Sequence, residues 1–122
     1  MKSFKILMIA IAMITFQPAS AQSDKSERNI GIKTQSIKVY GNCGMDKKRI
    51  EKNAVLVDGV KSAVWNEDTQ ILTLKYNVSK NNIADDVQKK VAAAGNDTEK
   101  YRADDAVYES LPDCCHYPRK NS

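Results

Sequence analysis

The chain has 122 residues and a formal net charge of +4, with 42% hydrophobic and 28% charged residues. This length suits one domain. Lys2 and Lys5 precede an apolar N-terminal run, and without them the charge falls to +2. Such a mild charge argues against nucleic-acid binding, which usually requires a strongly basic surface.

The first 21 residues are predicted to be a signal peptide. An apolar stretch at 6–16 is too short to span a bilayer as a helix. Ala19-Ser20-Ala21 then provides the small residues of a cleavage site. An uncleaved membrane anchor is the alternative, and either arrangement places the domain outside the cytoplasm. We therefore expect a periplasmic or secreted protein whose mature chain has no membrane span and starts with a flexible leader at 22–33.

Hydrophobic periodicity predicts six elements after this leader. Apolar and polar residues alternate in the strand segments, as in half-buried strands. In the first helical segment, Ile50, Ala54 and Val57 recur at helical spacing and would face a core. The predicted order is strand, helix, strand, strand, helix, strand, at 34–40, 46–56, 60–65, 71–76, 81–94 and 98–102.

Residues 104–122 form an extension to this βαββαβ unit. Asp104 or Asp105 can cap a short helix that runs to Leu111, and Pro112 ends it. The sequence Cys114-Cys115-His116 follows directly. The extension therefore combines a short helix with three residues that can bind metal.

The three cysteines are Cys43, Cys114 and Cys115. Cys43 lies in a glycine-flanked loop before a helix, where the helix dipole and free amides favour the thiolate, the form that binds metal. An odd number of cysteines leaves one thiol outside any set of disulfides within the chain. In an oxidising compartment, thiols need a metal, a reductant or burial to stay reduced.

The element order and the loop Cys43-Gly44-Met45-Asp46 resemble the heavy-metal-associated domain, a family that includes the periplasmic mercury-binding protein and small copper chaperones. The resemblance covers 34–103. It also rests on three short segments: Ile50-Glu51-Lys52, Gly59-Val60 and Ala93-Ala94-Gly95. It implies an α+β fold, a ferredoxin-like βαββαβ open-faced sandwich with four antiparallel strands and two helices on one face. This chain would add a short C-terminal helical extension.

The family motif is typically G-M-x-C-x-x-C, and this chain departs from it at two positions. Cys43 matches the first cysteine, Gly41 stands where methionine is usual, and Asp46 stands where the second cysteine is usual. A single thiolate cannot chelate a metal, and Asp46 offers a hard oxygen that suits Zn(II) better than Cu(I). Further ligands would have to come from elsewhere in the chain.

The C-terminal extension has the length to supply them. A fourth strand antiparallel to the first would end opposite the Cys43 loop, roughly 20–25 Å away, about the length of a strand. A helix of about eight residues rises about 12 Å, and three extended residues add roughly 10 Å. The candidate metal ligands are Cys43, Asp46, Cys114, Cys115 and His116.

The predicted function is that of an exported heavy-metal-binding protein. It would hold Cu(I) or Zn(II) and buffer it, or pass it by thiolate exchange to a metal-transporting or metal-receiving protein. Two alternatives remain open. Cys43 can be the remnant of a degenerate site with Asp46 as a helix cap, or a Cys43–tail disulfide can define a non-metal interaction module. No catalytic constellation is present, so we expect no enzyme activity.

Overall fold

Three antiparallel strands form one sheet in residues 31–119, the part of the chain that the computed structural model describes. They are β1 (Ile32–Lys38), β2 (Val60–Asn66) and β3 (Ile71–Asn77), and β3 lies in the centre. β2 and β3 form the predicted hairpin, and β1 pairs along the full length of β3. The predicted first strand is shifted by two residues, because 39–40 belong to the loop that follows β1.

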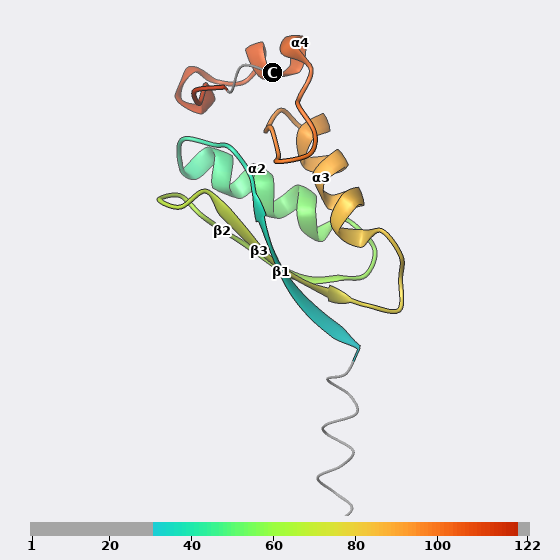
Figure 1. Cartoon of the computed structure of the whole chain (residues 1–122). Coiled ribbons are helices and arrows are strands. Elements are labelled where there is room, and N and C mark those ends of the chain that lie inside the picture. Colours follow the sequence, from blue (N-terminus) through green and yellow to red (C-terminus); the bar gives the residue numbers. More distant parts are fainter. Residues whose placement is uncertain (1–30, 120–122) are drawn as a thin grey trace, which may run out of the picture.

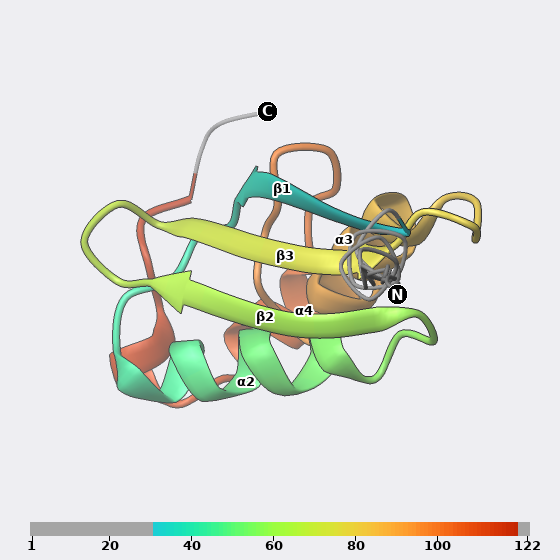
Figure 2. The ribbon, with the colours of Figure 1, turned by 90° about the horizontal axis from the view of Figure 1, so that it is seen from below.

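Two helices pack on one face of this sheet, as Figures 1 and 2 show: α2 (Gly44–Val55) and α3 (Ile83–Ala93). Alternate strand residues and one stripe of each helix meet in a single hydrophobic core. Its members are Ile37, Val39, Ile50, Ala54, Ala63, Trp65, Leu72, Leu74, Tyr76, Ile83, Val87 and Val91. The predicted helix stripe is confirmed, since Ile50 and Ala54 are fully buried and Val57 packs against the core. The open-faced α+β sandwich is likewise confirmed.

The predicted fourth strand at 98–102 is wrong. In the described residues, this segment pairs with the sheet only through an isolated bridge between Val39 and Thr98. The Thr98 amide donates to the Tyr101 carbonyl, and the Thr98 hydroxyl accepts from the Tyr101 amide. This tight turn reverses the chain, because a threonine side chain can satisfy backbone groups that a strand would otherwise pair. The chain therefore lies beside β1 only at its last residue, Lys38, whose carbonyl accepts the Glu99 amide.

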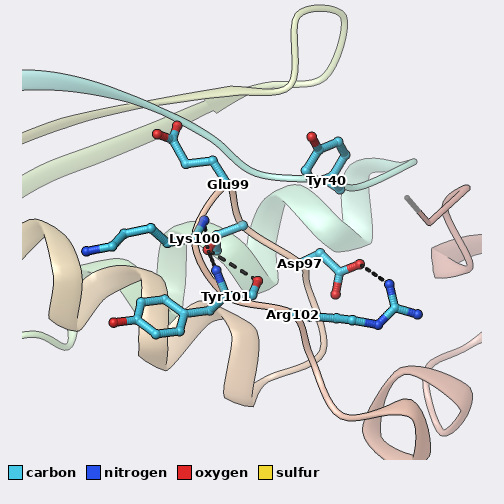
Figure 3. A pocket seen from close by; sticks show the side chains of 7 residues that line it. Tyr40, Asp97, Glu99, Lys100, Tyr101 and Arg102 are labelled. Atoms are coloured by element: carbon cyan, nitrogen blue, oxygen red, sulfur yellow. Dashed lines mark hydrogen bonds and ion pairs between the residues drawn. The ribbon is translucent and has the colours of Figure 1, made fainter. Parts of the chain in front are cut away.

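A shallow pocket of about 210 Å³ lies where the fourth strand would start. Figure 3 shows it between Tyr40, in the loop after β1, and the side chains of 97–102. None of the cysteines lines this pocket. The residues of the turn at 98–101 line this pocket, and it is separate from the three cysteines expected to bind metal.

After the turn the chain forms two short helices, α4 (Asp105–Glu109) and the 3-10 helix η1 (Asp113–Cys115). Both lie at the end of the molecule where β1 passes into α2 (Figure 1). The predicted helix is thus present but shorter, ending at Glu109 rather than Leu111. The division into signal peptide, leader, domain and extension stays a prediction. The signal peptide and most of the leader lie outside the described residues, and no helix within 31–119 is long and apolar enough to cross a membrane.

Candidate metal centre

Three thiol sulfurs lie together at this end of the molecule. The Sγ atom of Cys43 is 3.6 Å from that of Cys114 and 3.7 Å from that of Cys115, and the last two are 3.9 Å apart. All three cysteines are free. An ion bonded at about 2.3 Å to tetrahedral ligands keeps its sulfurs about 3.8 Å apart. The triangle therefore has the size of three corners of one metal site.

The start of helix α2 positions Cys43. This residue is the helix N-cap in an extended conformation, and its carbonyl accepts the Lys47 amide at 3.0 Å. Burial opposes ionisation of the thiol. The backbone amides of Asp46 and Met45 and the neighbouring thiols outweigh this effect and lower the pKa of Cys43 below its ordinary value. Free amides at a helix N-terminus stabilise a thiolate in this way.

The C-terminal segment brings the other two sulfurs. Figures 1 and 2 both place this segment beside the loop between β1 and α2. The Asn42 side chain donates to the Cys114 carbonyl at 3.2 Å, which ties the tail to that loop. Cys114 is exposed, whereas Cys115 is fully buried. Burial raises the pKa of Cys115 to about 11, although a hydrogen bond from Arg49 opposes the shift.

Tyr117 and Arg119 anchor the tail from the other side. The Tyr117 hydroxyl donates to the Gly95 carbonyl at 2.7 Å and accepts the Asp97 amide at 2.8 Å. The Arg119 guanidinium pairs with the Asp97 carboxylate at 2.7 Å and donates to the Ala103 carbonyl at 2.6 Å. These buried contacts hold the tail on the α3–α4 connection, so the position of Cys115 is fixed from both flanks.

Asp46 is fully buried and is not part of the sulfur cluster. One carboxylate oxygen accepts the Asn42 amide at 2.6 Å. The other accepts from Arg49 at 2.6 Å and from the Asn96 side chain at 3.0 Å. Both oxygens are engaged, so Asp46 acts as the anchor of Arg49 and of the loop. Asp46 was expected beside the sulfurs as a ligand, but the structure groups the three cysteines without it.

Arg49 is a site residue that the sequence did not reveal. Its guanidinium donates to the Cys115 sulfur at 3.3 Å while it pairs with Asp46. The sulfur contact raises the pKa of Arg49 against the effect of burial. A permanent positive charge at this place offsets part of the negative charge that accumulates when several thiolates share one ion. The (i, i+3) spacing from Asp46 was the available signal.

His116 also lies outside the sulfur triangle. Its ring packs on Tyr108, with 4.9 Å between the ring centroids. Its Nε2 atom is buried and has no hydrogen-bond partner among the described residues. The structure thus brings together three of the five predicted site residues and places His116 and Asp46 beside them.

One comparison with known proteins found a similar fold. A solved structure described as a CopZ metallochaperone matches with a TM-score of 0.50 and 25% sequence identity. The match covers 98% of that chain and 54% of this one. This likeness supports a heavy-metal-associated-like domain in this chain. No protein-family model and no curated protein matches the sequence.

Proposed function

We propose that this protein is an exported carrier of a soft metal ion, with Cu(I) as its cargo. Cys43, Cys114 and Cys115 would bind the ion as thiolates. The observation that carries the proposal is the sulfur triangle with sides of 3.6 to 3.9 Å. Likeness to a metallochaperone in both fold and sequence supports it. The apolar N-terminal run and its small-residue cleavage pattern support export.

The donor atoms favour Cu(I) over Zn(II). Thiolate sulfur is a soft ligand that suits Cu(I), and Zn(II) accepts it as well. Asp46, the harder ligand expected to favour zinc, is occupied by hydrogen bonds. His116 lies outside the sulfur triangle, with its ring packed on Tyr108. A structural zinc site is closed by its four protein ligands, whereas the exposed thiol of Cys114 leaves this site open to a receiving protein.

Ligand exchange is the proposed route of transfer. Cys114 is exposed and Cys43 partly exposed, so a thiolate of a receiving protein can approach the ion at these two residues. Metal binding requires deprotonated thiols and therefore releases protons. The low pKa of Cys43 suits it to bind first, and the buried Cys115 thiol would lose its proton as the ion enters.

The test is a competition titration of the reduced chain starting at residue 22. Cu(I) and Zn(II) are each titrated against a chelator of known affinity, with Cys43→Ser, Cys114→Ser and Cys115→Ser in parallel. Asp113→Asn is the matched control, because it changes an exposed residue of η1 without removing a sulfur. Each serine variant should weaken Cu(I) binding while the control does not. Wild-type binding no tighter than that of Cys43→Ser would overturn the proposal.

The competing function is a non-metal interaction module held by a disulfide from Cys43 to the tail. The sulfurs are close enough for small movements to join two of them, since a disulfide bond is about 2.05 Å long. Mass spectrometry of the protein taken from an oxidising compartment distinguishes the two functions. A Cys43 bridge supports the module, and three free thiols with bound copper support the carrier. Cell fractionation tests export separately.

A further inference from the structure

A fourth sulfur atom lies next to the triangle. Met45, in the first turn of α2, places its Sδ atom 3.4 Å from the Cys114 Sγ atom. Met45 is 48% exposed and takes no part in the hydrophobic core. The rigid start of the helix holds both Cys43 and Met45, so the thioether stays near the thiols. Its placement needs an explanation other than core packing.

A copper site built from the three thiols would have one position left. Three sulfurs about 3.8 Å apart account for three corners of a tetrahedron around an ion with bonds of about 2.3 Å. Thioether sulfur is, like thiolate, a soft ligand that selects Cu(I). The 3.4 Å separation of Met45 Sδ from Cys114 Sγ is close to the spacing of two sulfurs on one ion.

The four sulfurs also follow a gradient of exposure. Cys115 is fully buried, Cys43 is intermediate, and Cys114 and Met45 are exposed. A groove of about 750 Å³ begins at Met45 and follows the outer face of α2 to Leu56. A sulfur donor of another protein therefore has open access to the Met45 side of the site and none to Cys115.

We propose that Met45 is the fourth sulfur ligand of the bound Cu(I), and that it is the first ligand an incoming thiolate displaces. The inference rests on the proposed carrier function. In the exchange, a bond forms from the incoming thiolate sulfur to copper as the bond from copper to Met45 Sδ breaks. The thioether leaves as a neutral group that needs no proton, and copper remains Cu(I). A departing cysteine would need a proton to leave as a neutral thiol.

Selenium labelling tests this directly, because Met45 is the only methionine from residue 22 onward. The reduced chain starting at Gln22, prepared with selenomethionine and loaded with Cu(I), is measured by X-ray absorption at the selenium and copper edges. The expected result is a copper neighbour in the first shell of selenium, which an excess of a small thiol removes before copper leaves the protein. If the selenium spectrum of copper-loaded protein shows only carbon neighbours and no copper, the inference is wrong.

The control moves the label along the same groove. In the double variant Met45→Leu, Leu56→Met, the label is eleven residues away on α2, about 16 Å along the helix, and should show no copper neighbour. Met45→Leu keeps a side chain of similar size, and should bind Cu(I) less tightly than wild type but more tightly than Cys114→Ser. If wild type and Cys43→Ser both fail to bind copper, the carrier function itself fails, which is distinct from bound copper without a selenium contact.

Discussion

Replacing Asp46 with asparagine should destabilise the fold far more than its position in a metal motif suggests. Asp46 is 0% exposed and pairs with Arg49, whose side chain is 18% exposed. Asparagine keeps the shape but removes the charge. It leaves Arg49 as a partly buried cation without its carboxylate. The amide also offers only one acceptor oxygen in place of two, so either the Asn42 amide or the Arg49–Asn96 pair loses its partner.

The expected cost is about 3 kcal/mol. Removing one partner of a buried ion pair costs about 3–5 kcal/mol, because the other charge stays buried and unpaired. The lower end applies since water reaches part of Arg49. A domain of this size has about 4–13 kcal/mol of stability at 0.05–0.15 kcal/mol per residue. The loss is therefore a large fraction of the total, and roughly 12–24 °C in melting temperature.

Urea denaturation of the reduced, metal-free protein at pH 7 measures this loss from the midpoint at constant slope. Asp58→Asn is the matched control, because Asp58 pairs with Lys80 at the surface, where water screens both charges. Its midpoint should stay close to that of wild type. A free energy of unfolding for Asp46→Asn within about 1 kcal/mol of wild type would refute the role given to this ion pair, since such a loss is typical of an exposed contact.

Two further predictions concern the loop and the tail. Gly41→Ala should destabilise the fold by about 1–3 kcal/mol, because a Cβ atom there would lie 2.9 Å from the Trp65 ring and 3.0 Å from Asp46. A Cβ atom at Gly44 meets nothing within 4 Å, so Gly44→Ala should be neutral or slightly stabilising in the same urea denaturation. Burial opposes ionisation of Asp97, but Arg119 and the Ala103 amide lower its pKa in the folded state. The contribution of Asp97 to stability is thus complete above its unfolded pKa of about 3.9 and is lost as pH falls through its folded pKa. Urea midpoints measured between pH 2 and 7 should therefore depend on pH less steeply in Asp97→Asn than in wild type. Equal slopes for the two proteins would contradict this prediction.

The fold could be predicted because its signals are local. Apolar residues at periods of two and of three to four place β2, β3, α2 and α3 within a few residues of where they lie. The missing fourth strand was not predictable from this periodicity. Asn96, Asp97 and Thr98 are turn-forming residues, and each bonds backbone groups here. That turn chemistry outweighs the short alternating pattern of 98–102.

The proximity of Cys114 to Cys43 was predicted, but the predicted path of the chain between them was wrong. The predicted path ran down the sheet along a fourth strand and returned along a helix of about eight residues. The chain instead turns at Thr98–Tyr101 and stays at the end where β1 passes into α2. The five-residue α4 has only a short distance to cover. The spacing of Arg49 from Asp46 could predict their ion pair, but the contact of Arg49 with Cys115 depends on where the tail docks, which no local pattern encodes.

Asp46, which stands where the second motif cysteine is usual, is linked through Arg49 to the Cys-Cys sequence of the tail. The Asp46 carboxylate accepts hydrogen bonds from Arg49 and Asn96, and Arg49 in turn contacts the Cys115 sulfur. The second and third thiols then come from the far end of the chain. An ion shared by Cys43, Cys114 and Cys115 would cross-link residues about seventy positions apart. An ion that binds only the docked state stabilises that state by mass action. If the chain carries copper as proposed, copper loading and tail docking would therefore strengthen each other, and release of the ion would loosen the tail.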